Sequence, residues 1–366
     1  MSAPVVIFSA SIGAGHDGAA AELARRLEDQ GQAVVRHDFL DMLPAGLGLR
    51  LRSLYASQLH TFPQSWAHVL TVAGRPRVAS GAAGLSVRLA ASRMLAAIPL
   101  DASAVVSTYP LATQVLGRLR STERLPMPVA AVMTDPWVHP LCVAGGVDVH
   151  LAPGRPIAAQ VHRLGGPAVA VAPLVRPAFQ PVSGPGERAA ARHRLGLPVD
   201  ERLAVVVAGS WGVGDVAATA RDITASGVAV PVVVCGRNER LHRRLDRTSD
   251  AIVFGWVDTM PDLLRAADVV VHNAGGLSSA EAMASGVPVI SYRCLPGHGV
   301  ANAAALEDAD VSPWPQTVAE LTVEVKLAIT GMARRPPAEA GPDATAIITS
   351  LTATGVVPAA AEVIAA

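Results

Sequence analysis

A histidine stands inside a glycine-rich turn near the start of the chain, in the stretch GAGHDG. An apolar run precedes the turn and a helical pattern follows it, so we expect His16 at a helix N-terminus. The positive end of a helix dipole disfavours a protonated imidazole, which keeps the ring able to accept a proton. The neighbouring glycines, Gly15 among them, leave room for a substrate. These features predict a general base at His16, whereas the simpler interpretation is a polar loop residue.

The same turn has the glycine spacing of a dinucleotide site. Gly13, Gly15 and Gly18 give the pattern G-x-G-x-x-G, and Asp38 follows about 20 residues after the last glycine. That pattern is typical of nicotinamide-binding turns, in which bare backbone contacts a pyrophosphate. The bulky side chain of His16 follows the second glycine, where the phosphate would lie, and this disfavours a dinucleotide. We therefore expect the turn to position the histidine.

Phosphate-binding loops are predicted in the second half of the chain. Gly209, Gly212 and Gly214 follow one apolar run in VVVAGSWGVGD, and Gly275 and Gly276 follow another in VVHNAGGLSS. A helix N-terminus behind a loop of small residues offers free N–H groups and a positive dipole end, and both attract phosphate. One such loop is also explained as a tight strand-to-helix turn. Two of them at the carboxyl ends of parallel strands favour a nucleotide site.

An acidic residue lies about one turn into the helix that follows the second of these loops. The carboxylate of Glu281 could accept hydrogen bonds from two ribose hydroxyls, as acids do in other nucleotide sites of this kind. The alternative is an exposed helix glutamate. Small and apolar neighbours flank Glu281 in the stretch AEAMA, so simple exposure is less favourable.

Apolar, β-branched runs alternate with helical patterns along the whole chain. Strands are predicted at 5–9, 33–37, 104–107, 129–133 and 147–152 in the first half, and at 203–208, 230–235, 252–255, 269–272 and 287–291 in the second. Helices are predicted after the first strand, at about 47–70, 84–98, 110–120 and 155–164, between the later strands, and at about 316–330. This alternation is typical of α/β folds with doubly wound parallel sheets.

Three regions follow from this pattern. Residues 1–180 and 187–335 are each predicted to form a Rossmann-like domain, and the two domains are expected to face each other across a cleft. A proline- and glycine-rich stretch near residues 180–186 would connect them. Residues 336–366 are rich in alanine and proline and are predicted to be a C-terminal tail.

Composition excludes several classes of function. The formal net charge of the 366 residues is zero, which gives no indication of a nucleic-acid partner. Three widely separated cysteines argue for a reducing compartment and against a disulfide or zinc framework. The N-terminus makes a poor signal peptide, and no apolar run reaches the roughly 18 residues of a membrane span. The chain is expected to be cytoplasmic, and peripheral contact with a membrane stays open.

One stretch has an unusual charge pattern. Residues 45–100 contain six arginines and no aspartate or glutamate, with leucines and aromatic residues between the arginines. Arginines that bind phosphates and apolar groups that enter the acyl boundary would suit an anionic membrane surface. We expect Arg50, Arg52, Arg75 and Arg77 to make that contact. The alternative is a solvated helix pair whose arginines pair with acids elsewhere.

Other catalytic motifs are absent or poorly placed. Asp308 and Asp310 have the D-x-D form of a metal–nucleotide pair, but they follow a late helix in the wrong half. The eleven histidines have no metal-ligand spacing with cysteines or acids, so no metal site is predicted. Neither G-x-S-x-G nor G-x-x-x-x-G-K-[ST] occurs, which removes the common hydrolase and P-loop interpretations.

Five stretches together resemble one enzyme family. In order they are FSASIGAGHDGAAAEL, AVMTDPWVHPLCVAGGVDVHLAP, VVVAGSWGVGD, VVCGRNERL and FGWVDTMPDLLRAADVVVHNAGGLSSAEAMASGVPVISYRCLPGHGVANA. They resemble the monogalactosyldiacylglycerol synthases and processive diacylglycerol glucosyltransferases, which are GT-B enzymes of the family 28 type. The resemblance covers about residues 4–305. The last stretch is the most specific, because it keeps the loop, the acidic helix and a P-G-x-x-x-x-N turn at the family's spacing.

The resemblance implies an inverting, metal-independent transfer of a hexose from a UDP-sugar to a hydroxyl of a lipid, without any cofactor. It implies that His16 is the base, that Glu281 binds ribose and that the backbone of Val257 contacts uracil. Asp135 and His139, with Gly15, would lie on the acceptor side. The residues implied to contact the nucleotide sugar are Gly209, Ser210, Trp211, Gly212, Gly214, Val257, Gly275, Gly276, Leu277, Ser278, Glu281, His298 and Asn302.

The chain departs from the family at several positions. His298 and Gly299 replace a glutamine and a glutamate that are associated with the hydroxyls of the donor sugar, which leaves the hexose undetermined. Cys142 stands where tryptophan is common, and Asp17 where a basic or amide residue often follows the histidine. The alternatives are a glycosyltransferase acting on a soluble hydrophobic aglycone, a UDP-sugar 2-epimerase and a non-catalytic UDP-sugar-binding regulator. The sequence leaves the acceptor, the linkage, processivity and the oligomeric state undetermined.

Overall fold

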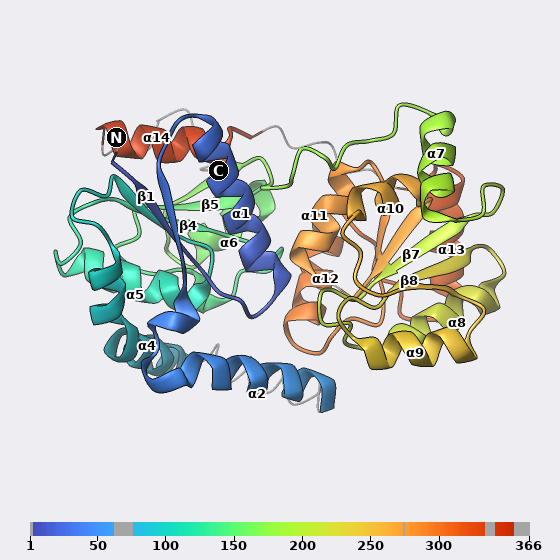
Figure 1. Ribbon diagram of the computed structural model, residues 1–366, viewed down its shortest axis with the longest axis horizontal. Helices are drawn as coiled ribbons and strands as arrows, with labels where there is room; N and C mark the ends of the chain where they lie inside the picture. Colours follow the sequence, from blue (N-terminus) through green and yellow to red (C-terminus); the bar gives the residue numbers. More distant parts are fainter. Residues whose placement is uncertain (1–2, 62–75, 274, 334–340, 355–366) are drawn as a thin grey trace. The chain divides into compact units, whose positions relative to one another are not determined.

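The computed structural model describes residues 3–61, 76–273, 275–333 and 341–354 (Figure 1). The described chain forms two compact units. The first contains the described residues of Met1–Ser57, His68–Leu174 and Ala338–Ala366, and the second those of Gln58–Ala67 and Val175–Pro337. Each unit has its own parallel sheet and its own hydrophobic core.

The first sheet has the strand order β2-β1-β3-β4-β5-β6, and all its pairings are parallel. Its strands are β1 (Val5–Ser9), β2 (Val34–Asp38), β3 (Ala104–Ser107), β4 (Val129–Val132), β5 (Val149–Pro153) and β6 (Ala168–Val171). The central strands are buried on both faces, as expected of a parallel sheet covered by helices on each side.

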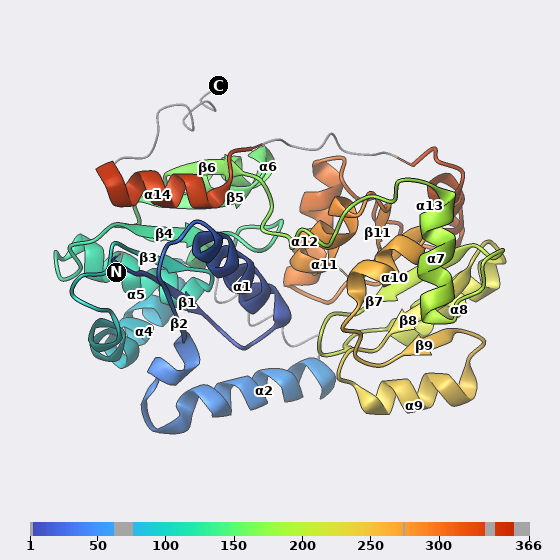
Figure 2. The same ribbon diagram turned by 45° about the horizontal axis from the view of Figure 1, so that its top comes forward.

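Helices cover both faces of this sheet (Figures 1 and 2). They are α1 (Ala14–Asp29), α4 (Pro76–Ala97), α5 (Pro110–Ser121), α6 (Arg155–Arg163) and α14 (Ala344–Thr354). Helix α2 (Leu47–Thr61) also follows β2 but extends away from the sheet (Figures 1 and 2). Helices α4 and α5 pack in one apolar cluster with Phe8 and Phe39, while α1 and α14 pack in a second with Ile7. The fold is therefore doubly wound, as the sequence predicted.

Helix α14 comes from the region that the sequence analysis leaves as a C-terminal tail. Ile347, Ile348 and Leu351 enter the apolar cluster beneath α1. Arg26 of α1 forms a 2.8 Å ion pair with Asp343 just before α14, and Gln30 donates a 2.8 Å hydrogen bond to Thr345. This segment is therefore a structural part of the first unit.

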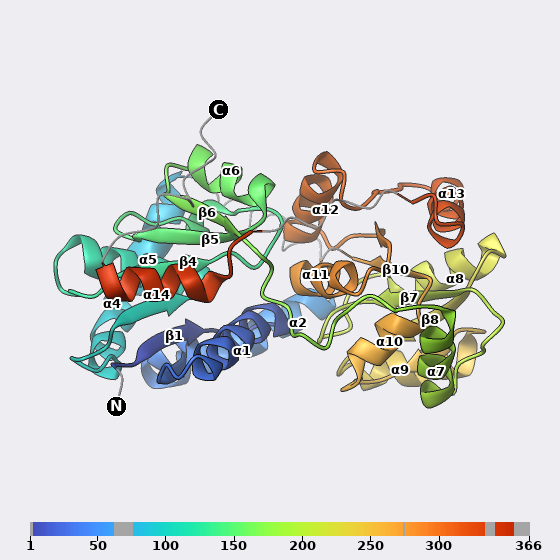
Figure 3. The same cartoon turned by 90° about the horizontal axis from the view of Figure 1, so that it is seen from above.

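The second sheet has the strand order β11-β10-β7-β8-β9, again with parallel pairings. Its strands are β7 (Leu203–Val207), β8 (Val230–Val234), β9 (Ile252–Phe254), β10 (Val269–His272) and β11 (Val289–Ser291). Its helices are α7 (Pro185–Leu195), α8 (Val216–Ser226), α9 (Glu239–Thr248), α10 (Met260–Ala266), α11 (Gly276–Ala284), α12 (His298–Asp308) and α13 (Val318–Ile329). Figure 3 shows α8 and α13 on one side of this sheet.

A buried ion pair fastens α7 to the second sheet. The guanidinium of Arg192 is 2.7 Å from Asp268, and both side chains are almost fully buried. Arg192 also donates to the carbonyl oxygens of Val199 and Glu201, and Asp268 accepts from the amide of Leu203 at the start of β7. Because each charged group has several partners, its removal from water is compensated.

The ten predicted strands are all present, with ends that differ by at most two residues. The sequence analysis did not identify β6, a four-residue strand of alternating alanine and valine. Helix α2 ends at Thr61 within the described residues, and the rest of the helix predicted over 47–70 lies outside them.

Candidate functional site

His16 lies in the first turn of α1, at the carboxyl edge of the first sheet. The helix follows Gly13, which has an extended backbone. The ring atom Nδ1 of His16 is 2.6 Å from the carbonyl oxygen of Thr108 and 3.2 Å from the hydroxyl of Thr134. The hydroxyl of Thr108 donates a 3.1 Å hydrogen bond to the carbonyl oxygen of His16. Since Thr108 follows β3 and Thr134 follows β4, two neighbouring strands hold this side chain.

Aromatic and buried side chains surround His16. The ring of Tyr109 meets the imidazole edge to face, with centroids 5.3 Å apart, and the ring of Phe39 packs against Tyr109 with centroids 5.5 Å apart. Burial raises the pKa of Tyr109 well above its ordinary value. One side of the histidine is therefore largely shielded from water. Hydrogen bonds in such surroundings are stronger than in water.

The structure brings Asp135 to the same sheet edge. Asp135 directly follows Thr134 and is half-buried. Burial raises the pKa of Cys142 to about 12, and the charge of Asp135 contributes to that shift. Burial and then Asp135 likewise raise the pKa of Tyr55, a residue of α2. The charge of Asp135 thus acts on both Cys142 and Tyr55, which were not among the predicted site residues.

His139 has a structural role in this region. Its Nδ1 accepts a 3.1 Å hydrogen bond from the amide of Leu141, so it caps the short 3₁₀ turn Pro140–Cys142. The indole of Trp137 meets its ring edge to face at 5.4 Å. The residue is 8% exposed. His139 thus supports the loop after β4, and its place on the acceptor side stays a prediction.

The arginines predicted to contact a membrane differ from one another. Arg50 of α2 is exposed, together with Leu49 and Leu54, which are 67% and 64% exposed. Arg52 is half-buried and donates a 3.4 Å hydrogen bond to the hydroxyl of Ser11, so its guanidinium turns towards the sheet edge instead of the open face of α2. Arg75 and the side chain of Arg77 lie outside the described residues.

In the second unit, the loop from Gly209 to Gly214 has a conformation that requires glycine. Gly212 has φ +55°, and a Cβ there would lie 2.1 Å from the carbonyl oxygen of Cys235. The amide of Arg237 donates to Ser210 O at 2.9 Å, and the side chain of Asn238 donates to Gly212 O at 2.8 Å. The turn after β8 therefore holds this loop in place. Trp211 lies within the loop and is half-buried.

The second glycine loop leads into α11 as predicted. Gly275 precedes the first helical residue, Gly276, and the hydroxyl of Ser279 bonds back to their carbonyl oxygens at 3.0 and 2.8 Å. The first amides of a helix have no intrahelical acceptor, so those of residues 276–278 can bind an anion. Leu277 and Ser278 are half-buried there.

A second helix N-terminus lies beside the first. Helix α12 begins at His298 after Gly297, which has φ +85°. A Cβ on Gly299 would lie 3.1 Å from the carbonyl oxygen of Asn273, which places this helix start against the turn before α11. Asn302, one turn further along, is fully buried. Two helix N-termini therefore lie at one edge of the second sheet, where their dipoles add.

Glu281 is the acidic group of this edge. Burial raises its pKa to about 7, and Arg176 opposes that shift. Within the described part of the chain its carboxylate makes no hydrogen bond. A hydroxyl donor placed there would therefore stabilise the ionised form. Val257, which follows β9, is half-buried.

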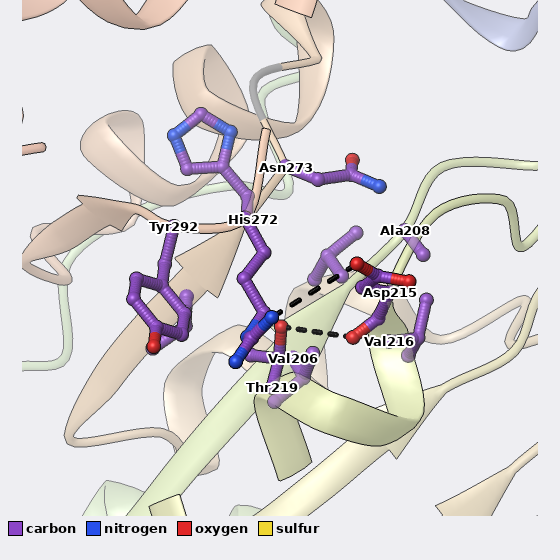
Figure 4. Close-up of a pocket in the computed structure, with 11 residues that line it drawn as sticks. Val206, Ala208, Asp215, Val216, Thr219, His272, Asn273 and Tyr292 are labelled. Atoms are coloured by element: carbon purple, nitrogen blue, oxygen red, sulfur yellow. Dashed lines mark hydrogen bonds and ion pairs between the residues drawn. The ribbon is translucent and has the colours of Figure 1, made fainter. Parts of the chain in front are cut away.

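A small pocket lies behind the glycine loops, between the ends of β7 and β10 and the start of α8 (Figure 4). Two of its polar side chains, those of Tyr292 and Arg293, bond to Asp222 just outside the pocket. Arg293 bonds to Asp222 at 2.8 Å and lies 3.9 Å from Asp215, while the hydroxyl of Tyr292 donates to Asp222 at 2.9 Å. Burial lowers the pKa of His272 to about 4, so it stays neutral. We assign this pocket to the support of the loops.

Asn273 connects that support to the loops themselves. In Figure 4 its side chain points away from the ring of His272, its neighbour at the end of β10. Its amide donates a 2.7 Å hydrogen bond to the carbonyl oxygen of Val213. The first glycine loop and the turn before α11 are therefore joined by one side chain. The sequence analysis did not single out Asn273, although it lies within the quoted stretch.

The described residues contain neither a cluster of metal ligands nor a membrane-spanning helix. Among the described residues, no group of three or more histidines, cysteines, aspartates and glutamates could hold a metal ion. In the same part of the chain, no helix combines the length and apolar character that crossing a bilayer requires.

Comparison with known sequences identifies relatives over part of the chain. Residues 210–324 match the model of the family described as glycosyl transferases group 1. The processive diacylglycerol beta-glucosyltransferase of Bacillus mycoides (strain KBAB4) is 29% identical over 215 residues, 56% of this chain and 53% of that protein. The protein of the same name from Bacillus cereus (strain G9842) is 29% identical over 244 residues, 61% of each chain. The chain thus matches between half and two thirds of the length of these curated relatives.

Comparison with solved structures identifies the fold. Acinetobacter baumannii MurG superposes with a TM-score of 0.56 at 16% identity, covering 96% of this chain and 99% of that one. The glycosyltransferase of kitacinnamycin gives 0.57 at 15% identity, covering 98% and 100%. LpCGTa, solved in complex with UDP, gives 0.53 at 15% identity, covering 96% and 99%. The chain therefore has the GT-B fold, and part of it is similar in sequence to the processive diacylglycerol beta-glucosyltransferases.

Proposed function

We propose that this chain is a glycosyltransferase that moves a hexose from a UDP-sugar to a hydroxyl of a diacylglycerol-like lipid. The observation that carries the proposal is the edge of the second sheet, where two helix N-termini, a glycine loop and an unpaired carboxylate lie together. This edge falls within residues 210–324, the range of the family match. The names of the curated relatives support the lipid acceptor.

The donor side binds the nucleotide through backbone and small residues. The amides at the start of α11 and of the Gly209–Gly214 loop bind the diphosphate, with the helix dipoles behind them. The carboxylate of Glu281 accepts hydrogen bonds from the ribose hydroxyls, and the backbone of Val257 contacts the uracil. His298 and Asn302 lie on α12, where the hexose is expected. His298 stands at the position of an amide in related enzymes, so the identity of the hexose is left open.

The acceptor side supplies the base. The Nε2 atom of His16 takes the proton of the acceptor hydroxyl as its oxygen attacks the anomeric carbon. The bond from that carbon to the diphosphate breaks, and UDP leaves with the electron pair. Attack from the face opposite to UDP inverts the anomeric configuration. Asp135 and the backbone at Gly15 lie on the acceptor side of this step.

No metal ion enters the proposed step. Negative charge that develops on the departing diphosphate is stabilised by the amides and helix dipoles that already bind it. These groups are held in place by Asn238 and Asn273, so they need no rearrangement when the bond breaks.

The exposed face of α2 is the part of the first unit suited to an anionic membrane surface. Its leucines Leu49 and Leu54 are exposed beside Arg50, in a region with no acidic residue from 45 to 100. Arginine and exposed leucine are the residue types that bind headgroups and enter the acyl boundary. We propose that the protein acts from the cytoplasm, peripherally on the inner face of the membrane.

A UDP-release screen tests the function. Wild-type protein is incubated with UDP-glucose, UDP-galactose or UDP-N-acetylglucosamine, with and without diacylglycerol in vesicles. We expect UDP release from one donor that depends on the lipid. UDP release that depends on a soluble aromatic alcohol instead of the lipid would indicate a different acceptor. Epimerised sugar without UDP release would indicate a 2-epimerase, and UDP-sugar binding without turnover would indicate a regulator. Each of these results contradicts the proposed reaction.

A further inference from the structure

The hydrogen bonds of His16 determine which ring nitrogen can accept a proton. A neutral imidazole has one N–H and one bare nitrogen. The carbonyl oxygen of Thr108 lies 2.6 Å from Nδ1, and a carbonyl oxygen can only accept. The hydrogen must therefore be on Nδ1, and Nε2 carries the lone pair. The hydroxyl of Thr134, 3.2 Å from Nδ1, accepts a second and longer bond from the same N–H.

Two nearby carboxylates, those of Asp17 and Asp38, accept hydrogen bonds from groups other than His16. Asp17, the next residue along α1, accepts a 2.7 Å hydrogen bond from the hydroxyl of Ser9. Asp38, after β2, accepts from the amides of Ser11 and Leu40 at 3.3 and 2.9 Å. Within the described residues, the polar contacts of the His16 side chain are those with Thr108 and Thr134. The ring is thus held by neutral groups.

Thr108 holds His16 at two points. Its carbonyl oxygen accepts from the ring, and its hydroxyl donates to the carbonyl oxygen of the same histidine at 3.1 Å. Tyr109 then closes one side of the ring by an edge-to-face contact. Main chain and side chain of His16 are both fixed, so the direction of the Nε2 lone pair is set before any substrate binds.

We propose that Thr108 and Thr134 are positioning residues that keep His16 in the Nδ1–H tautomer, with Nε2 as the proton-accepting atom and without a carboxylate partner. The inference rests on the proposed role of His16 as the base. It extends that role because it names the two residues through which the sheet controls the base. It also predicts that the base needs no acid–histidine pair.

The tautomer is measured directly by ¹⁵N NMR of histidine-labelled protein at a pH where the ring is neutral. The His16 signals are assigned by their loss in His16→Gln. We expect a protonated Nδ1 and a bare Nε2 in the protein without ligands. A protonated Nε2 would overturn the inference, whatever the catalytic activity.

A matched series of variants tests the contribution of Thr134. Thr134→Val keeps the shape but removes the hydroxyl acceptor, and Thr134→Ser keeps the acceptor. One neutral hydrogen bond corresponds to a change of about fivefold, so we expect Thr134→Val to lower kcat about fivefold. The KM for the donor and the Kd of UDP should stay unchanged, and Thr134→Ser should restore kcat. Unchanged kcat in Thr134→Val, or a loss shared equally by both variants, would contradict the role of Thr134.

A carboxylate control completes the experiment. Asp17→Asn keeps an acceptor for Ser9, so the tautomer and kcat should match those of the wild type. A loss of kcat as large as that of Thr134→Val would indicate that an acid supports the base and would overturn the inference. The proposed function fails separately: if His16→Gln transfers sugar at the wild-type rate, His16 is not the base even where the NMR signals are as expected.

Discussion

The sheet edges of the two units are built differently. At the edge of the first sheet, His16 contacts Thr108 and Thr134, residues from three segments far apart in sequence. At the edge of the second sheet, the site consists of backbone amides and glycines that follow single strands. One edge is organised around a titratable side chain and the other around helix dipoles and tight turns. Chemistry and nucleotide binding should therefore respond to separate substitutions.

The largest effect is expected from removing His16, the proposed base. His16→Ala should lower kcat by about two to four orders of magnitude, because proton transfer by a positioned side chain contributes that much. The Kd of UDP should stay within twofold, since we propose that UDP binds at the edge of the second sheet. Steady-state kinetics and calorimetric titration with UDP measure the two quantities on one preparation. Equal losses of kcat and of UDP affinity would show that catalysis and nucleotide binding are not assigned to separate sheet edges.

Gly212→Ala is the matching substitution in the second unit, and it should affect nucleotide binding. A Cβ at this position would meet Cys235 O at 2.1 Å, in a left-handed backbone conformation, so the loop must rearrange. We expect UDP affinity to fall by at least about tenfold, since the contacts proposed between this loop and the diphosphate would be lost. Gly186→Ala in α7 is the control, because a Cβ there meets nothing within 4 Å. Normal UDP binding by Gly212→Ala would show that this loop does not contact the nucleotide.

The carboxylate of Glu281 predicts a pH dependence of donor binding. Its pKa is raised to about 7 by burial, so its ionised form predominates only above that pH. We propose that this ionised form accepts hydrogen bonds from the ribose hydroxyls. UDP affinity should therefore rise about tenfold between roughly pH 6 and 8 and level off above, because binding releases a proton. Glu281→Gln should give a flat profile over the same range. A rise of the same size in the variant would assign the titration to another group.

The smallest effect concerns α2. Arg50→Gln should weaken binding to anionic vesicles about fivefold at low salt, since one surface arginine contributes about 1 kcal/mol. Arg52→Gln should weaken it less, because Arg52 turns towards Ser11. Vesicle sedimentation compares the two variants. Equal effects would mean that both arginines face the membrane, and no effect in either would make this face of α2 simply solvated.

The difference between the edges also explains what the sequence could predict. The glycine loops and Glu281 are local patterns, so Gly212, Gly275 and the start of α11 lie where the motifs indicated. His16 was singled out from its own turn, and its role as the base stays a prediction. Thr108 and Thr134 were not, because an ordinary threonine after a strand acquires its role only when β1, β3 and β4 pair.

Fold elements follow the same rule. The central strands are continuous β-branched runs and were predicted closely. Strand β6 was missed because it has four residues of alternating alanine and valine. Helix α14 was missed because its alanine-rich neighbourhood gives no sign that Ile348 packs beneath α1. Arg52 was grouped with exposed arginines because composition does not indicate which side of a helix an arginine lies on.

The most direct test of the proposed reaction is the anomeric configuration of the glycolipid product. Wild-type protein, the preferred UDP-α-hexose and diacylglycerol vesicles are incubated, and the extracted lipid is analysed by mass spectrometry and NMR. The account predicts a hexosyl lipid with a β linkage, formed in equal amount to UDP and absent with His16→Ala. An α-linked product, or UDP formed without any glycolipid, would contradict it.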